Sequence, residues 1–547
     1  MCGIWALLRR HGSTSMSPAE IAAHVRALEA RGPEYTAIQD VSGGTQVTLG
    51  FTRLAINGLT PAGHQPFTHD GISVVCNGEI YNYQTLTVRH GLTLPEGTSD
   101  CAVLPHLART LTPVELCRTL DGVFAFVMVD EATQTVTVAR DPYGVRPLFQ
   151  LTMPDGTHMW ASELKALPTR SACARIRPFP PGTVERYDAR TGELLEAQKY
   201  HEIPHVKQVF ADRQHAAQHL HDALVVAVKK RLLSDRPIGA LLSGGVDSSL
   251  VAAIAARELA AQGKRIHTFS IGMPGSTDLV FAAKVATHIN SIHHEIVVSP
   301  EDFLAAIPEV VCAAETYDIT SVRASVGNYL VGKFIKEHTD IKVVFNGDGS
   351  DEIGGGYLYF YAAPSDEAFE SESERLLHEI HLFDVLRSDR SMAAHGLEAR
   401  TPFLDKAVVA AWRAIPSAWR RPLRGDVMGR GAAMEKQILR EAFDSSGLLP
   451  FEVLWRKKEA FSDGVSATTD SWYARCAAHA RTLGAVDLAA AAMWHNPPPT
   501  EEAFWYRALF EAAYGSAAAT VIPHMWMPRW IAGACDPSAR TLTTLYA

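Results

Sequence analysis

The pattern of apolar residues changes once along this chain, near residues 203–212, and the change constrains the fold more than any other feature. Before it, short β-rich runs such as TQVTLGF and GVFAFVMV are separated by Gly, Pro and Asp, which is typical of packed antiparallel sheets. After it, apolar strands alternate with longer helical segments, which is the βαβ pattern of a parallel sheet covered by helices. The 547 residues also exceed the roughly 250 to 300 that one hydrophobic core can serve. We therefore predict two domains, residues 1–205 and 206–547.

Composition and charge exclude several classes of protein. Hydrophobic residues make up 47% and charged residues 20% of the chain, as in ordinary globular proteins. The formal charge is −9 and no run of Lys or Arg offers a surface for a phosphate backbone. No apolar run approaches the roughly 20 residues that cross a bilayer, and the start, MCGIWALLRR, lacks the charged region of a secretory signal. We expect a cytoplasmic protein that binds neither nucleic acid nor membrane.

Cys2 is the cysteine that suggests chemistry. The eight cysteines include no CxxC pair, so neither a disulfide framework nor a zinc site is indicated. Removal of Met1 would leave Cys2 at the N-terminus, where its thiol can attack and its own α-amine, with a reference pKa near 8, can accept the proton. Taken alone, an N-terminal cysteine is more often incidental.

Seven motifs, in order along the first domain, change those odds. They are CGIWAL, RGPE, RLAIN, HQP, NGEIYN, LDGVFAF and RDPYGVRPLF. Together they closely resemble the class II, or N-terminal-nucleophile, glutamine amidotransferases. The resemblance implies an αββα sandwich with Cys2 as nucleophile and Asn77 and Gly78 as further catalytic residues. It assigns glutamine contacts to Arg53, Leu54, Ala55, Ile56, Asn57, Asn77, Gly78, Glu79 and Asp100.

These residue types suit the hydrolysis of a glutamine side chain. An Asn side chain and a main-chain N–H at a glycine can stabilise the developing oxyanion. A guanidinium suits the α-carboxylate, and carboxylates suit the α-ammonium. Two positions depart from the family pattern. Relatives commonly carry HRGPD where residues 30–34 of this chain read ARGPE, with Glu34 last, and they carry Asp where this chain has Asn57. We expect these changes to affect closure of the glutamine loop rather than the nucleophile.

The second domain contains a glycine-rich loop, LLSGGVDSS, which follows the apolar strand IGALL and precedes a helix expected from Leu250. The N–H groups of such a loop and the positive end of the helix dipole can bind phosphate, and Asp247 can hold Mg²⁺. The loop resembles the pyrophosphate loop of the ATP-pyrophosphatase superfamily. No GxxxxGK[ST] motif is present, so we expect AMP rather than ADP as product.

Two further segments complete the predicted nucleotide site. The acidic loop 346–352 follows the strand KVVF, and open α/β sheets bind ligands at the carboxyl ends of their strands. Asp351 is therefore a second candidate Mg²⁺ ligand. Lys458, in LWRKKEAFSDG, aligns with the phosphate-binding lysine of the family. Without the resemblance, the first would be a surface turn and the second a solvated basic helix end.

The motifs ETYDITSVRAS, LFDVLRSDR, AHGLEARTPFLD and DPSARTL resemble the glutamine-hydrolysing asparagine synthetases. The resemblance implies a Rossmann-like parallel α/β domain with additional helices, the substrates glutamine, aspartate and ATP, the cofactor Mg²⁺, and a homodimer. An internal ammonia tunnel between the two sites is also expected. Aspartate contacts fall on Thr320 and Arg323, metal contacts on Asp247 and Asp351, and a catalytic role on Asp348. ATP contacts fall on Leu241, Ser243, Gly244, Gly245, Asp247, Ser248, Ile271, Asn346, Gly347 and Lys458.

Asp348 is the departure with the largest expected effect. Relatives usually read SGEGSDE where this chain reads NGDGSDE. The shorter side chain withdraws the carboxylate by about 1 Å, and such a shift can cost on the order of a hundredfold in rate. Two alternatives remain: a β-lactam-synthetase-like enzyme, although that group typically lacks the N-terminal cysteine, and a catalytically impaired relative. The intact Cys2, Asn77, Asp247 and Lys458 argue against impairment, so we predict an active enzyme with altered efficiency.

Overall fold

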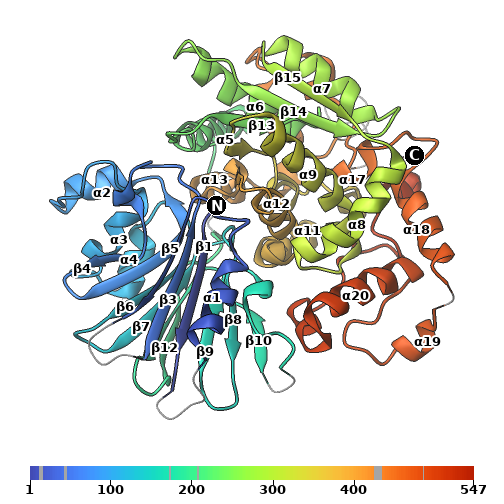
Figure 1. Cartoon of the computed structure of the whole chain (residues 1–547). Helices are drawn as coiled ribbons and strands as arrows, with labels where there is room; N and C mark the ends of the chain where they lie inside the picture. The colour runs from blue at the N-terminus through green and yellow to red at the C-terminus, as the bar shows by residue number, and fades with distance from the viewer. Residues whose placement is uncertain are drawn as a thin grey trace.

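The computed structural model describes residues 1–10, 16–41, 46–171, 174–205, 209–423, 434–484 and 486–546. The first part of the chain forms two antiparallel sheets of six strands each, drawn in blue to teal in Figure 1. One sheet has the order β10-β8-β9-β1-β3-β2 and the other β12-β11-β7-β6-β5-β4. Their bounds are β1 Gly3–Leu8, β2 Tyr35–Asp40, β3 Val47–Arg53, β4 Phe67–His69, β5 Ile72–Ile80, β6 Gly122–Asp130, β7 Thr135–Arg140, β8 Phe149–Thr152, β9 His158–Ala161, β10 Arg175–Pro178, β11 Thr183–Asp188 and β12 Leu194–Lys199.

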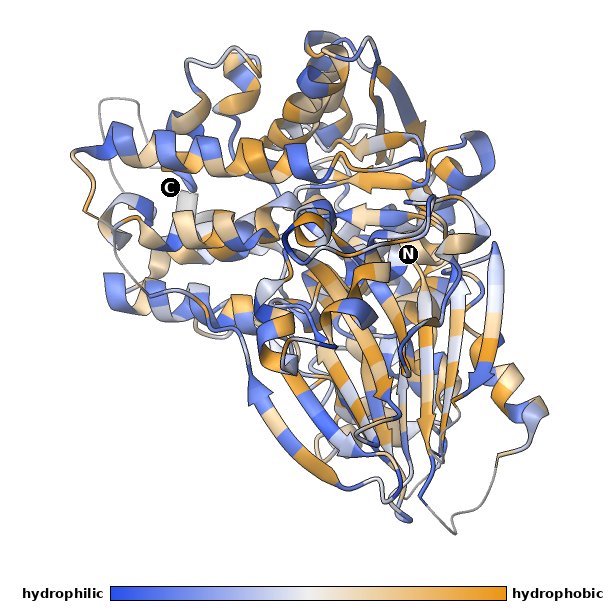
Figure 2. Ribbon diagram, turned by 90° about the vertical axis from the view of Figure 1, so that its left-hand side faces the viewer, coloured by the Kyte–Doolittle hydropathy of each residue, from blue (hydrophilic) through white to orange (hydrophobic). Residues whose placement is uncertain are grey.

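The central strands are buried on both faces, because each sheet lies between the other sheet and a layer of helices. In β1, Ile4 and Ala6 pack on the opposite sheet, whereas Trp5 and Leu7 pack against Val25 of α1 (Pro18–Arg26). The helices α2 (Tyr83–Arg89), α3 (Val103–Leu107) and α4 (Pro113–Thr119) cover the outer face of the second sheet. Apolar residues accordingly run along these strands in Figure 2. This arrangement confirms the predicted αββα sandwich, which we call the first domain.

The second domain is built on a five-stranded parallel sheet of order β15-β14-β13-β16-β17. The chain runs outward from β13 to one edge and then returns to β16 on its other side, so the order reverses between these two strands. The bounds are β13 Ile238–Leu241, β14 His267–Gly272, β15 Ile292–Val297, β16 Val343–Phe345 and β17 Glu398–Arg400. The first helices are α5 Arg213–Lys230, α6 Val246–Ala260, α7 Thr277–His288, α8 Pro300–Ala314 and α9 Ile319–His338. This confirms the predicted parallel α/β domain.

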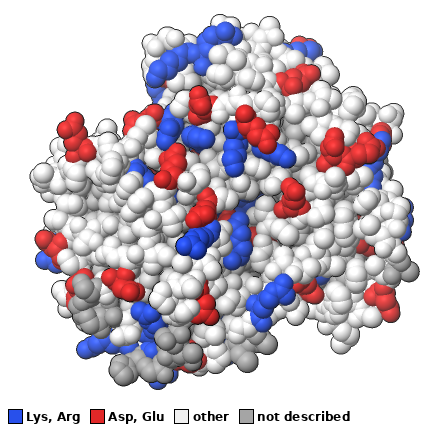
Figure 3. All heavy atoms as spheres, in the orientation of Figure 1, with Lys and Arg blue, Asp and Glu red and all other residues white. Residues whose placement is uncertain are grey.

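Helices dominate the rest of the chain, as the sequence predicted. They are α10 Ser350–Gly354, α11 Asp366–Glu379, α12 Asp384–Ala393, α13 Lys406–Ala414, α14 Ser417–Arg420, α15 Gln437–Phe443, α16 Phe451–Leu454, α17 Phe461–Gly464, α18 Trp472–Thr482, α19 Leu488–Ala491 and α20 Glu501–Tyr514. Within the described ranges, none of the helices combines the length and apolar character needed to cross a membrane. Acidic and basic side chains are interspersed on the face shown in Figure 3.

One local prediction was wrong, and one alternative interpretation does not hold. Helix α6 begins at Val246, not Leu250, because Gly245 already has the extended backbone of an N-cap (φ −74°, ψ 156°). Asp247 therefore lies in the first turn of the helix. The basic residues around Lys458 do not form a helix end but lie in the irregular segment between α16 and α17.

Candidate active sites

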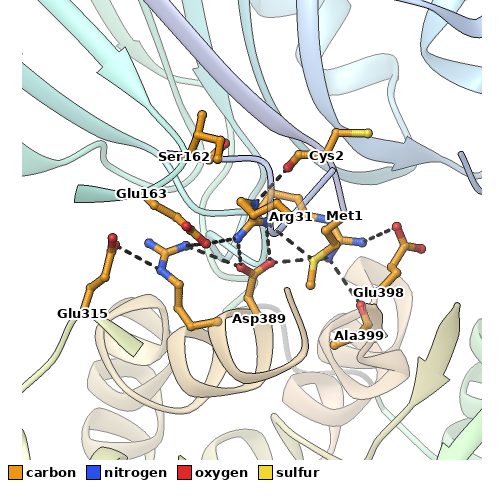
Figure 4. Close-up of polar contacts among 12 residues, drawn as sticks. Met1, Cys2, Arg31, Ser162, Glu163, Glu315, Asp389, Glu398 and Ala399 are labelled. Carbon is orange, nitrogen blue, oxygen red and sulfur yellow. Dashed lines mark hydrogen bonds and ion pairs between the residues drawn. The ribbon is translucent and has the colours of Figure 1, made fainter. Parts of the chain in front are cut away.

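Cys2 lies where the two domains meet, directly before β1. Its Sγ is 3.6 Å from the main-chain oxygen of Leu54. Arg31 donates from Nε to the main-chain oxygen of Cys2 at 2.9 Å and from Nη1 to Glu163 and Asp389 at 2.7 Å each (Figure 4). Asp389 belongs to α12, so Arg31 fastens the main chain of the predicted nucleophile to the second domain. The sequence motif RGPE contained Arg31, but its spacing gave no sign of this partner.

Burial shifts the pKa of the Cys2 thiol and of the α-ammonium of the preceding residue, Met1. It raises the pKa of the Cys2 thiol to about 11, an effect that the neighbouring α-ammonium partly offsets. It lowers the pKa of the α-ammonium to about 6, against the raising effect of the Glu398 carboxylate that faces it in Figure 4. This amine belongs to Met1, whereas the predicted general base is the α-amine that Cys2 would carry after removal of Met1.

Asn77 and Gly78 lie within β5, paired with β6. The Asn77 side chain is buried, and neither its Nδ2 nor its Oδ1 has a hydrogen-bond partner. Since buried amides are normally hydrogen-bonded, an unpaired donor fits the predicted oxyanion contact. A Cβ at Gly78 would lie 2.5 Å from the main-chain oxygen of Val123, so the close pairing of the strands requires glycine here.

The predicted glutamine loop, residues 53–57, is held from both domains. Arg53 donates from Nη1 to the Thr60 oxygen at 2.8 Å and from Nη2 to the Gly58 oxygen. The main-chain N–H of Ala55 donates to Glu34 Oε2 at 2.8 Å. Arg236 of the second domain donates to Glu34 Oε1 at 2.8 Å and to the Ala55 oxygen at 2.9 Å. Glu34, one of the two departures, therefore supports the loop and ties it to the second domain.

The side chains of Leu54 and Ile56 are buried and pack against Val343 of β16 and Ile238 of β13. The side chains of Leu54 and Ile56 therefore contribute to the packing between the two domains. Their contacts with glutamine stay predictions from the resemblance.

The two carboxylates predicted to bind the α-ammonium are both buried, and they are held differently. Asp100 accepts from the main-chain N–H of Ile80 at 2.5 Å and from Ser99 Oγ at 2.9 Å, both within the first domain. Glu79 accepts from Asn57 Nδ2 at 2.6 Å. Asn57, the other departure, thus orients a predicted substrate ligand, which an aspartate at this position could not do as a donor unless protonated.

The second candidate site lies at the carboxyl ends of β13 and β16, where the strand order reverses. A Cβ at Gly347 would lie 2.6 Å from the main-chain nitrogen of Ser248, so the loop after β16 passes directly over the start of α6. Ser350 Oγ donates to Asp247 Oδ1 at 2.7 Å, which links the two loops. A cavity of about 160 Å³ opens here. Its lining includes the predicted residues Leu241, Ser243, Gly245, Asp247, Ser248, Ile271, Thr320, Asn346, Gly347, Asp348, Asp351 and Lys458.

Lys436, which the sequence analysis missed, lies behind the lining of this cavity and contacts two of the lining residues. It is fully buried, and its Nζ donates to Asp247 Oδ2 at 2.5 Å and to Asp351 Oδ1 at 2.6 Å. Lys458 Nζ donates to the other oxygen of Asp351 at 2.6 Å. Burial alone would raise the pKa of Asp351, but Lys436 and Lys458 hold it below its ordinary value.

The donor set suits Mg²⁺. Carboxylate oxygens of Asp247 and Asp351 converge on a single point, because the same ammonium lies within 2.6 Å of both. Mg²⁺ in nucleotide enzymes is typically held by one or two carboxylates together with substrate phosphates. These two residues would hold the ion, which would neutralise charge on the phosphates.

Thr320 and Arg323 differ in where they point. Thr320 lines the cavity, and its buried hydroxyl has no hydrogen-bond partner, so it is free to bind a substrate. Arg323 donates to Glu502 of α20 at 2.8 and 2.6 Å and to Asp536, which follows α20 in the chain, at 2.9 and 2.8 Å. Arg323 is thus not among the lining residues, and its contact with aspartate stays a prediction from the resemblance.

Gly244 is also outside the lining. Its φ is +71°, and a Cβ would lie 2.5 Å from the main-chain nitrogen of Ala282 in α7. This glycine allows the loop to pack against α7, and its contact with ATP stays a prediction. Its neighbour Gly245 does face the cavity.

Asp348 faces the cavity with a defined partner. Its Oδ1 accepts from Arg387 Nη2 at 2.9 Å, and Arg387 also pairs with Asp384 at 2.8 Å. Burial raises the pKa of Asp348, and Arg387 opposes that shift. The shorter carboxylate is therefore held in place by α12, which the local sequence did not indicate.

Comparisons with known proteins identify the families of both domains. Residues 1–191 match the glutamine amidotransferase domain family, and residues 219–371 and 361–532 match the asparagine synthase family. The chain thus combines a glutamine amidotransferase domain with an ATP-dependent synthetase domain. It is 41% identical over 570 residues to the human asparagine synthetase [glutamine-hydrolyzing], with 99% of each chain covered. It is 40% identical to the Gallus gallus enzyme of that name, with 99% of this chain and 98% of the relative covered. The chain belongs to the glutamine-hydrolysing asparagine synthetases, as the motifs predicted.

Proposed function

We propose that this protein makes L-asparagine from L-aspartate, using ATP and ammonia released from L-glutamine, with glutamate, AMP and pyrophosphate as the other products. One observation supports this most. Asp247 and Asp351 come from loops more than a hundred positions apart, and both lie close to Lys458 where the strand order of the sheet reverses. The relatives of this chain are similar to it over its whole length. The β-lactam-synthetase-like and catalytically impaired alternatives are not favoured, since the similarity includes the complete glutaminase domain.

In the first domain, the thiol of Cys2 attacks the amide carbon of glutamine and its proton passes to the α-amine. Asn77 Nδ2 and the N–H of Gly78 stabilise the oxyanion. Collapse of this intermediate transfers the proton to the leaving ammonia and forms a thioester, which water hydrolyses to glutamate. Arg53 holds the α-carboxylate of the substrate, while the carboxylates of Glu79 and Asp100 hold its α-ammonium.

In the second domain, a β-carboxylate oxygen of aspartate attacks the α-phosphorus of ATP and pyrophosphate leaves. Lys458 donates hydrogen bonds to the departing phosphates, Lys436 holds the carboxylates of Asp247 and Asp351 in place, and Thr320 binds aspartate. Asp247 and Asp351 would hold Mg²⁺, which would neutralise charge on the phosphates. Ammonia then attacks the activated β-carbonyl carbon and AMP leaves. A cytoplasmic location, a homodimer and an ammonia tunnel stay predictions from the sequence and the family.

The test is to incubate the Met1-processed protein with ATP, Mg²⁺ and aspartate, and with either glutamine or an ammonium salt. Asparagine, AMP and pyrophosphate are quantified, and a Cys2→Ala variant is measured in parallel. We expect asparagine from both nitrogen donors, with only the glutamine-dependent route lost in the variant. The proposal fails if neither asparagine nor aspartate-dependent pyrophosphate is formed.

A further inference from the structure

Arg400, at the end of β17 in the second domain, extends its guanidinium into the first domain. The side chain is 1% exposed. Its Nη2 lies 3.2 Å from Glu79 Oε2, its Nε donates to Glu398 Oε1 at 2.8 Å, and its Nη1 donates to the main-chain oxygens of Arg231 and of Leu233. The Nη1 and Nε contacts fix the plane of the guanidinium within the second domain. Nη2 forms no hydrogen bond, and its contact is the ion pair with Glu79 of the predicted glutamine site.

Glu79 needs such a partner because its surroundings oppose ionisation. Burial raises its pKa well above the ordinary value, and the carboxylates of Glu398 and Asp100 raise it further, whereas Arg400 and then Arg146 lower it. Asn57 donates one neutral hydrogen bond to the carboxylate. Among the residues that the structure describes, Arg400 is the cation that pairs with Glu79 directly. A buried carboxylate that loses its cation protonates at neutral pH rather than remaining charged.

We propose that Arg400 is a positioning residue of the glutamine site: its guanidinium, 3.2 Å from Glu79, orients this carboxylate toward the α-ammonium of glutamine and favours its charged form. The inference rests on the proposed function, since it takes Glu79 as a ligand of glutamine. The other predicted ammonium ligand, Asp100, is held by main-chain and hydroxyl donors of its own domain. The glutamine site is therefore complete only when β17 of the synthetase domain is packed against it.

The test uses the full-length enzyme and the variants Arg400→Gln and Arg400→Lys. Glutamate release gives kcat and KM for glutamine, and asparagine formation from an ammonium salt reports on the second site alone. In Arg400→Gln we expect KM for glutamine to rise at least about tenfold, with kcat much less affected, because a buried charge has lost its partner. Synthesis from ammonia should stay within about twofold of the unmodified enzyme, and Arg400→Lys should recover part of the loss.

Asp121→Asn is the matched control. It breaks a different ion pair across the same domain interface, since Asp121 pairs with Lys230 of α5 at 2.7 Å. We expect wild-type KM for glutamine in this variant. An increase equal to that of Arg400→Gln would mean that any loosening of the interface disturbs the site, and the proposal would be wrong.

The pH dependence gives a readout that a purely structural role would not move. Glu79 faces Asp100 from the first domain, Glu398 and Arg400 from β17, and Arg146 from the segment after β7. Without the Arg400 charge, the acidic limb of kcat/KM for glutamine should shift to higher pH, because Glu79 then protonates at higher pH. In a Glu79→Gln background, Arg400→Gln should cause no further rise in KM.

Three results would overturn the inference. These are an unchanged KM in Arg400→Gln, an equal loss of the glutamine and ammonia routes, and an additive effect of the two substitutions. If Arg400→Gln does not fold, Glu79→Gln decides, since wild-type KM there would show that the charge of Glu79 is not needed. Failure of the proposed function is distinguishable, because the unmodified enzyme would then release no glutamate from glutamine.

Discussion

Replacing Asn77 by alanine removes a buried side-chain amide that forms no hydrogen bond in the free enzyme. If this amide binds only the oxyanion, its removal destabilises the transition state of glutamine hydrolysis and hardly changes the stability of the free enzyme. Removing one such donor costs about 10²- to 10³-fold in kcat in enzymes of this type of chemistry. We therefore expect glutaminase kcat to fall by about that factor, with a smaller change in KM.

The effect on stability should be small, because the substitution removes no hydrogen bond. The lost packing of the amide is offset by removal of an unsatisfied polar group, which costs about 1 to 3 kcal/mol when left buried. We expect the free energy of unfolding to change by less than about 1 kcal/mol. Asparagine synthesis from an ammonium salt should be unaffected.

Asn82→Ala supplies the matched control. Its amide is fully engaged, donating to the Thr119 oxygen at 3.0 Å and accepting from the Asp121 N–H at 3.0 Å. This variant should lose about 1 to 3 kcal/mol of stability and keep its glutaminase rate. Glutamate release and denaturant unfolding would be measured on both variants. A loss of less than tenfold in the Asn77→Ala rate, or destabilisation as large as that of Asn82→Ala, would refute the reasoning.

Three further predictions concern the second domain. Lys436→Met removes the ammonium that the carboxylates of Asp247 and Asp351 share, so the free enzyme should lose about 3 kcal/mol of stability. Added Mg²⁺ should then raise the Tm of the variant more than that of the unmodified enzyme, and equal increases in Tm would contradict this. Asp348→Glu should increase the rates of adenylation and amide formation, by up to about a hundredfold, whereas unchanged rates in single-turnover assays would show that Arg387 already places the shorter carboxylate well. Burial lowers the pKa of His395 to about 4, so its contribution to stability is present above pH 6.5 and is lost as the pH falls toward 4. In His395→Gln, the decrease in unfolding free energy between these pH values should be smaller by up to about 3 kcal/mol. Identical pH profiles of stability for the two proteins would argue against this.

The sequence predicted the local strand, loop and helix order around both sites, because each depends on residues that are neighbours along the chain. The carboxyl-end rule for parallel sheets also placed Asp247 and Asp351 together correctly. Lys436 could not be found this way. It contacts Asp247 across 189 positions, and an isolated lysine carries no signal of such a partner. The packing of α15 against α5 brings it there.

Partners across the domain interface were equally hidden. Arg31 and Asp389 are 358 positions apart, and both lie in motifs whose spacing predicts local structure only. Helix α6 was placed four residues too late, because apolar periodicity begins at Leu250 while the helical backbone begins at Val246. Arg323 illustrates the opposite problem, since its residue type suits a carboxylate substrate and the structure supplies it with two carboxylates of the protein.

The arrangement of Glu34 has a consequence for how this chain can be recombined. Its carboxylate bridges the Ala55 N–H of the glutamine loop and the Arg236 guanidinium of the other domain. A shorter aspartate would not span the same two donors without movement of the backbone. Positions 34 and 236 are therefore expected to vary together among homologues. A chimaera that exchanges the first domain for that of a relative should lose glutamine use unless position 236 is exchanged with it.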